Sequence, residues 1–226
     1  MKAAADVLIL GLAASLGAQA TSPAAELTAT SANVSGPGTP VKIRILRWST
    51  DEERAPVVAA LTPAPARGVP ADAARGPNTP AAGGRGAAGR GRGRGRGGPA
   101  APLSPIAALT AAIGRAPTIG YIWTTDVTGY SIKYAYRAPF AGGERIVLAT
   151  DRRFGANSIA WTLPPAAPST AYAFTVFELR LDATGSGEAK TSLTAAVVVD
   201  DEAKTVALRD YATALPILAL RTGASR

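Results

Sequence analysis

Hydrophobic and polar residues alternate with a period of two from Val41 to Ile45, in the sequence VKIRI. The apolar positions are Val41, Ile43 and Ile45, and the polar positions between them are Lys42 and Arg44. A strand has this period because its successive side chains point to opposite faces of a sheet. The pattern therefore predicts a strand from Val41 to Trp48 with one buried face and one exposed face.

A helix is predicted directly after this strand, from Asp51 to Leu61. Thr50 and Glu53 have the spacing of a capping box, in which each side chain bonds the other residue's backbone N–H. Ser49 and Glu52 have the same spacing. The acidic residues of the first turn also lie at the positive end of the helix dipole, so they have a structural role.

Prolines shape this helix and a second one. Pro56 falls inside the first helix, where it removes a backbone donor, so we expect that helix to be short or kinked. The second helix is predicted after a cap at Ser104, with Pro105 in its first turn and Pro117 beyond its end. Its apolar residues recur at helical spacing and fall on one face: Ile106, Leu109 and Ile113.

Beyond Pro117 the chain alternates between β-rich runs and short turn signals. Short connections favour antiparallel pairing, so we predict an α+β fold with a mostly antiparallel, curved or barrel-like sheet and two short helices. A weak strand at 26–32 could precede the others. The predicted strands after Pro117 are 118–124, 131–137, 145–150, 172–181, 190–199, 205–209 and 216–220.

The segment from Pro63 to Ala101 is built from Ala, Pro, Gly and Arg without apolar periodicity, which predicts a disordered Arg/Gly-rich insertion. Seven arginines and one aspartate there account for +6 of the chain's net charge of +8. The basic charge thus belongs to this linker and not to a folded surface. RNA-binding segments of this kind usually carry aromatic residues, and this one has none, so nucleic acid is an unlikely partner.

The first 20 residues have the pattern of a secretory signal peptide. Lys2 precedes an apolar run, and Ala18-Gln19-Ala20 forms a small-x-small cleavage site. We expect cleavage before Thr21, export to the periplasm or the cell exterior, and no transmembrane span. The predicted organisation is then an extension (21–40), the first strand and helix (41–62), the linker (63–101), and the rest of the same domain (102–222).

The chain contains no histidine and no cysteine. This excludes catalytic triads that need His, thiolate nucleophiles, disulfides, and zinc sites with His or Cys ligands. We predict no catalytic residue, no cofactor and no metal. An enzyme built from this chain would have to use carboxylates, Lys, Tyr, Ser or Thr.

Two acidic motifs have structural interpretations. The segment from Asp182 to Glu188 gathers acids and glycines as a calcium loop does, but its spacing lacks alternating ligands and fits a hairpin turn. Glu178 shares a strand face with Arg180, so we expect a paired, ionised carboxylate in a surface ladder and not a proton donor. A glycosidase-type pair would need a second carboxylate, and the spacing selects none.

Aromatic residues concentrate in the middle strands, and Ile132, Tyr134 and Tyr136 are expected to share one face. This distribution is typical both of a carbohydrate- or small-ligand-binding face and of an ordinary β core, and the core is the simpler interpretation. If a ligand face exists, its candidate contact residues are Trp123, Tyr134 and Trp161.

Several motifs together resemble an uncharacterised family of secreted bacterial proteins with a WSTDEER-type strand–helix signature and no assigned activity. The matching segments are WSTDEER (48–54), PTIGYIW (117–123), RIVLATDR (145–152), FTVFELRLD (174–182) and GSGEAK (185–190). The resemblance implies export and a shared fold and transfers no catalytic residue.

Three functions remain open from the sequence. The favoured one is an exported, non-enzymatic binding or structural module of the cell envelope, whose partner is an envelope component, a small ligand or a protein. The alternatives are a carboxylate-dependent hydrolase and Arg/Gly-mediated binding to an anionic polymer or nucleic acid.

Overall fold

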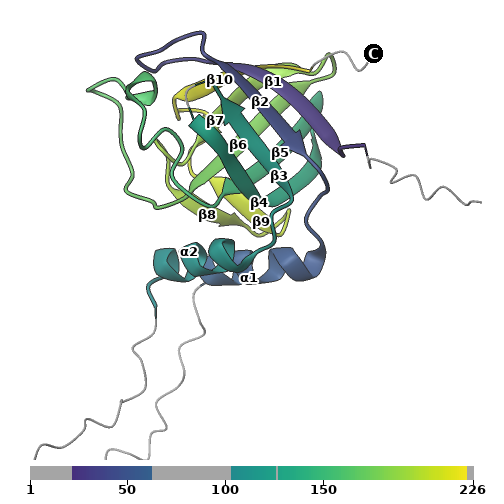
Figure 1. The fold of residues 1–226 in the computed structure, drawn as a ribbon. Helices are drawn as coiled ribbons and strands as arrows, with labels where there is room; N and C mark the ends of the chain where they lie inside the picture. Colours follow the sequence, from purple (N-terminus) through teal and green to yellow (C-terminus); the bar gives the residue numbers. More distant parts are fainter. Residues whose placement is uncertain (1–21, 63–102, 126, 223–226) are drawn as a thin grey trace, which may run out of the picture.

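The computed structural model describes residues 22–62, 103–125 and 127–222. Its central element is a closed antiparallel barrel with the strand order β1-β10-β7-β6-β5-β4-β3-β2 (Figure 1). The barrel strands are β1 (Ala25–Ser31), β2 (Pro40–Ile45), β3 (Gly120–Thr124), β4 (Val127–Phe140), β5 (Gly143–Thr150), β6 (Thr175–Asp182), β7 (Ser186–Thr191) and β10 (Pro216–Thr222). The predicted α+β fold with a barrel-like antiparallel sheet is confirmed.

Most barrel strands pair with the next strand in sequence, and two insertions interrupt this meander. Helices α1 (Asp51–Leu61) and α2 (Pro105–Arg115) lie between β2 and β3 in the chain. A separate hairpin, β8 (Val197–Asp200) with β9 (Thr205–Leu208), lies between β7 and β10. A short 3₁₀ helix, η2 (Ile159–Trp161), belongs to the long connection from β5 to β6.

Side chains fill the barrel interior. Ile43, Ile122, Leu148 and Leu179 are fully buried there, together with aromatic residues that pack edge to face or tilted. The Phe154 ring centroid lies 4.6 Å from that of Trp161, 4.7 Å from that of Tyr130 and 5.1 Å from that of Phe177. A barrel of eight strands is just wide enough for such a core, so this one is packed like an ordinary hydrophobic interior.

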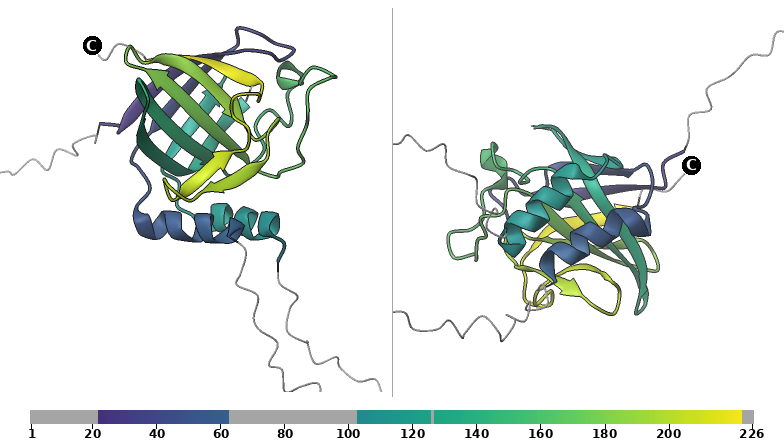
Figure 2. Two further views of the ribbon diagram at one scale, coloured as in Figure 1. Left: turned by 180° about the vertical axis from the view of Figure 1, so that it is seen from behind. Right: turned by 90° about the horizontal axis from the view of Figure 1, so that it is seen from below.

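The outer wall of β4, β5 and β6 carries a second apolar layer. The two helices lie side by side against the barrel, and the β8–β9 hairpin is adjacent to them (Figure 2). Val57, Leu109 and Ile113 of the helices pack with outward-facing residues of the barrel such as Val147 and Val176. This layer explains why β5 and β6 are buried on both faces.

The first predicted strand and helix are confirmed, although the strand ends at Ile45 and not at Trp48. β2 buries Val41, Ile43 and Ile45, and α1 starts with the capping box of Thr50 and Glu53. The helix continues through Pro56 without interruption.

The other candidate cap, Ser49, instead belongs to the barrel. Its hydroxyl accepts a hydrogen bond from the Ala135 N–H, and its own N–H donates to the Ala135 carbonyl. Ser49 therefore ties the start of α1 to β4.

The prediction of one strand at 190–199 is wrong, because these residues are divided between two sheets. Its first residues end β7, and Val197 starts β8. Between them, two side-chain hydroxyls bond backbone groups. The Ser192 hydroxyl accepts from the Val176 N–H, and the Thr194 hydroxyl donates to the Thr191 carbonyl. Such bonds compete with a regular ladder and turn the chain out of the barrel.

A bulge in β4 overturns the expectation that Ile132, Tyr134 and Tyr136 share a face. The pairing of β4 with β5 shifts register between Ile132 and Tyr134. Ile132 faces the barrel interior, whereas Tyr134 and Tyr136 belong to the outer apolar layer. One extra residue in a strand reverses the face of everything after it.

The signal peptide and the Arg/Gly-rich linker predicted at 63–101 lie outside the described residues. Within the described ranges, no helix is both long and apolar enough to cross a membrane.

The docking of α2 on the barrel can be tested at Leu109, which is fully buried. We expect Leu109→Ala to lower the free energy of unfolding by about 2–5 kcal/mol, because it removes buried methyl groups and leaves a cavity. Ile106→Ala, at a half-buried position of the same helix, is the matched control and should cost less. Urea denaturation measures both, and equal small losses would show that α2 packs loosely.

A candidate binding groove on the barrel wall

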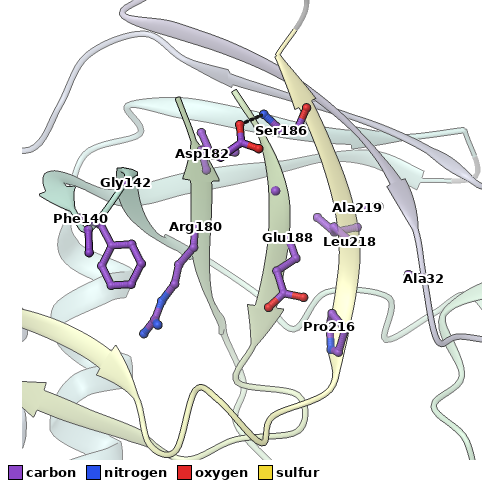
Figure 3. A pocket seen from close by; sticks show the side chains of 13 residues that line it. Ala32, Phe140, Gly142, Arg180, Asp182, Ser186, Glu188, Pro216, Leu218 and Ala219 are labelled. Carbon is purple, nitrogen blue, oxygen red and sulfur yellow. Dashed lines mark hydrogen bonds between the residues drawn. The ribbon is translucent and has the colours of Figure 1, made fainter. Parts of the chain in front are cut away.

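A groove of about 570 Å³ lies on the outer wall of the barrel where β6, β7 and β10 run side by side (Figure 3). Its walls include small residues, such as Ala219, and the end of β4 with the exposed ring of Phe140. Three charged side chains line it from β6 and β7: Arg180, Asp182 and Glu188.

Strand alternation places these polar groups outside the barrel. On β6, Leu179 and Leu181 belong to the interior core. The alternate residues Arg180 and Asp182 therefore face outward. On β7, Glu188 is the direct partner of Arg180 in the antiparallel register. The groove therefore presents a cation and an anion from adjacent strands.

The Arg180 guanidinium is held between two aromatic rings. Its central carbon lies 3.6 Å from the ring centroid of Tyr211 and 4.6 Å from that of Phe140. Its Nε and Nη2 donate to Glu178 Oε1 at 3.2 and 2.9 Å. The side chain keeps 31% of its surface exposed, and its Nη1 makes no hydrogen bond within the described residues.

Glu178 is the buried centre of an ionic network behind the groove. Its side chain is 1% exposed, so the expectation of a surface ladder is wrong, although its pairing with Arg180 is as predicted. Its Oε1 also lies 3.1 Å from the Arg145 Nε, and its Oε2 accepts from the Leu208 N–H at 3.0 Å. Because the carboxylate is buried beneath the β8–β9 hairpin, away from water, it requires these partners.

Arg145 extends the network to the β8–β9 hairpin. Its Nη1 donates to Asp200 Oδ2 at 2.6 Å, across the gap between the barrel wall and the end of β8. Burial alone would lower the pKa of Arg145, but the bond to Asp200 and the field of Glu178 raise it above its ordinary value. The guanidinium is therefore a permanent cation between two carboxylates.

Lys190 and Tyr211 complete the support beneath the groove. The buried Lys190 ammonium donates to the carbonyls of Tyr211 and Ala212 at 2.8 and 3.2 Å and lies 3.3 Å from Glu188 Oε1. Burial, and then the field of Glu188, raise the pKa of Tyr211 well above its usual range. Tyr211 is thus a neutral phenol that stacks on Arg180, unsuited to act as a base.

Asp182 acts as a turn cap at the end of β6. Its Oδ1 accepts from the Thr184 N–H at 2.8 Å, the Thr184 hydroxyl at 2.6 Å and the Ser186 N–H at 3.0 Å. The bond from the Thr184 side chain, followed by those from the backbone, holds the pKa of Asp182 below its ordinary value. The hairpin predicted for this segment is confirmed, with Gly185 at a φ of 78° in its turn.

The three aromatic residues predicted as ligand contacts do not lie together. Trp123 is on the outer wall of β3 and is 37% exposed. Tyr134 is buried beneath the outer layer, where its hydroxyl bonds that of Thr205. Trp161 is buried in the barrel core against Phe154.

The sequence contained a signal for part of the groove. Glu178 and Arg180 alternate with core residues on β6, and Glu188 and Lys190 do the same on β7, so charged outward faces were visible. Nothing local marked Tyr211, which reaches Arg180 from the connection before β10.

Comparisons with known proteins leave the geometry to carry the functional argument. A scan against protein-family models, a search of curated proteins and a search of solved structures each find no match. Among the described residues, no three His, Cys, Asp or Glu side chains are grouped to hold a metal ion.

The bond between Arg145 and Asp200 predicts a pH-dependent stability. Burial disfavours the charged Asp200 carboxylate, but bonds from the Ala203 N–H and from Arg145 outweigh burial and hold its pKa below the ordinary value. A lowered folded-state pKa stabilises the fold above the unfolded pKa, and this stability is lost as the pH falls through the folded pKa. We therefore expect Asp200→Asn to cost roughly 1–2 kcal/mol at neutral pH, allowing for partial exposure.

Urea unfolding of both proteins from about pH 7 down to about pH 2 tests this expectation, and the difference between them should shrink below about pH 4. Asp201→Asn, at the exposed neighbouring position, is the matched control. A difference that stays constant across the pH range would show that Asp200 contributes without its charge.

Proposed function

We propose that the protein is an exported, non-enzymatic binding module that holds a small polar ligand or a peptide segment in the groove beside Arg180. The observation that carries the proposal is the Arg180 guanidinium, which lines the groove, keeps 31% of its side-chain surface exposed, and is held by Glu178, Tyr211 and Phe140. A donor immobilised before binding loses little conformational freedom when a ligand arrives. Export rests on the sequence of the first 20 residues.

The filled barrel interior supports a site on the outer wall. A barrel that carries a ligand inside needs an open lumen. In this barrel, side chains such as Ile43, Ile122 and Phe177 are fully buried and fill the interior. The groove offers a different chemistry. Arg180 can donate to a carboxylate or carbonyl, Glu188 can accept from an amine or hydroxyl, and Phe140 can cover an apolar group.

The charge states in the groove support binding over hydrolysis. A carboxylate hydrolase needs one acid with a raised pKa to protonate the leaving group. Asp182 instead has a lowered pKa and a fully used Oδ1, and Glu188 lies beside the Lys190 ammonium. Both groups suit recognition of a ligand better than proton transfer.

A ligand screen tests the proposal. We expect a compound with a carboxylate and a hydrogen-bond donor, drawn from amino acids, short peptides and cell-wall fragments, to raise the melting temperature in a dose-dependent manner. Arg180→Lys should weaken its binding about tenfold, or about 1.4 kcal/mol, because lysine keeps the charge but loses the planar fork and the stacking. Isothermal titration calorimetry measures the affinity.

Phe140→Ala should weaken binding as well, since this ring is 41% exposed and lies over Arg180. The matched control is Leu46→Ala, which removes an apolar side chain of the same exposure (41%) outside the groove. Unchanged affinity in both groove variants would refute the assignment of the site.

A further inference from the structure

A second feature of the barrel wall lies away from the groove. Tyr121 and Trp123 project from the outer face of β3, where each is 37% exposed, and their ring centroids are 5.5 Å apart at an interplanar angle of 33°. β3 is four strands from β7 in either direction around the closed barrel, so this pair faces away from the groove. Neither ring belongs to an apolar cluster of the fold.

The backbone beside Trp123 leaves room for the indole ring. A side chain at Gly129 on β4 would collide with it, because a Cβ there would lie 2.8 Å from the Trp123 Nε1 and 2.9 Å from its Cδ1. The indole thus covers the bare backbone of β4 with one side, and its partial exposure leaves other ring surface open to solvent. The absence of a side chain at Gly129 therefore lets the Trp123 ring pack against β4 while it stays partly exposed.

Cations flank the aromatic pair in the strand register. On β2, Lys42 is the direct partner of Trp123, and Arg44 is the partner of Tyr121. Thr28 on β1 is the register partner of Lys42 on one side and of Arg221 on β10 on the other. These three exposed cations have no ion-pair partner within 4.0 Å among the residues that the structure describes, and Glu26 beside Arg44 is the acid of the same face.

We propose that this aromatic–basic face, formed by Tyr121, Trp123, Lys42, Arg44 and Arg221, binds an anionic polysaccharide. Aromatic faces stack on the apolar C–H faces of sugar rings, and the cations meet carboxylate, sulfate or phosphate groups on the chain. An open sheet face cannot enclose a small molecule as a pocket does, so the occupant is an extended polymer that makes several shallow contacts.

The composition of the face favours a polysaccharide over nucleic acid. Proteins that bind single-stranded nucleic acid combine stacking rings with a continuous positive groove that follows the phosphates. Here the cations are separated by Thr28, and Glu26 lies in the row of Arg44 and Tyr121, where it would repel a phosphate chain. Glu26, Thr28 and Ser131 beside Tyr121 instead provide polar groups suited to sugar hydroxyls.

The test uses the full chain and three polymers: polygalacturonate, neutral dextran, and oligo-dT. Biolayer interferometry should show binding to polygalacturonate that weakens with salt, and weaker or no binding to dextran. Trp123→Ser and the double variant K42Q/R44Q should each weaken polygalacturonate binding about tenfold. Ile159→Ser, at an exposed apolar residue of η2 that belongs to neither proposed site, should leave it unchanged.

Three results would overturn the proposal. Equal binding by wild type, Trp123→Ser and K42Q/R44Q would assign polyanion binding to the Arg/Gly-rich segment, which all variants retain. Tighter binding to oligo-dT than to polygalacturonate would make the face a nucleic-acid surface. A dimer in light scattering that Trp123→Ser dissociates, without polymer binding, would make it a contact between copies. Thermal melts verify that each variant folds. If Trp123→Ser does not fold, the double variant K42Q/R44Q tests the proposal alone.

Discussion

One buried carboxylate, that of Glu178, connects most of the functional architecture. Arg145 on β5 and Arg180 on β6 are direct cross-strand partners, and two like charges in that arrangement repel each other. Glu178 lies against both guanidinium groups and also accepts the Leu208 N–H from the hairpin. Because removing any partner would leave an uncompensated charge away from water, the barrel wall, the hairpin and the groove depend on this group together.

The packed barrel directs function to its surface. Its interior is closed by aliphatic and aromatic side chains, and a second apolar layer covers β4, β5 and β6. The remaining wall offers two regions with different chemistry, which share only strand β10, where Arg221 belongs to one and Ala219 to the other. The groove beside Arg180 is concave and carries both charges, whereas the aromatic–basic face is open and mostly cationic. Loss of one should leave the other intact.

Local patterns were sufficient for much of the fold. The alternation from Val41 to Ile45 and the capping box of Thr50 depend on neighbouring residues, so the sequence alone predicted the strand and the start of the helix. The features that were missed depend on distant partners. The bulge that turns Tyr134 outward is visible only in the pairing of β4 with β5, and β7 ends at Thr191, beyond which the Ser192 hydroxyl accepts the Val176 N–H in place of a backbone carbonyl.

The candidate site was harder to predict for the same reason. Glu178 has the alternation of an exposed strand residue, and only the hairpin that covers it makes it buried. Trp123 and Trp161 are the same residue type, yet Trp123 lies against Gly129 at the surface and Trp161 packs on Phe154 in the core. Tertiary packing decides which aromatic residues remain exposed, and the residue type alone does not reveal that packing.

Amide hydrogen exchange of wild type and Glu178→Ala tests the central role of this carboxylate most directly. The Leu208 N–H donates to Glu178 in the folded protein, so its exchange reports on the link between hairpin and barrel. Our account predicts a large loss of protection across β8 and β9 in the variant, while amides in the pairing of β1 with β2 stay protected. Unchanged protection at Leu208, or an equal loss throughout the barrel, would contradict it.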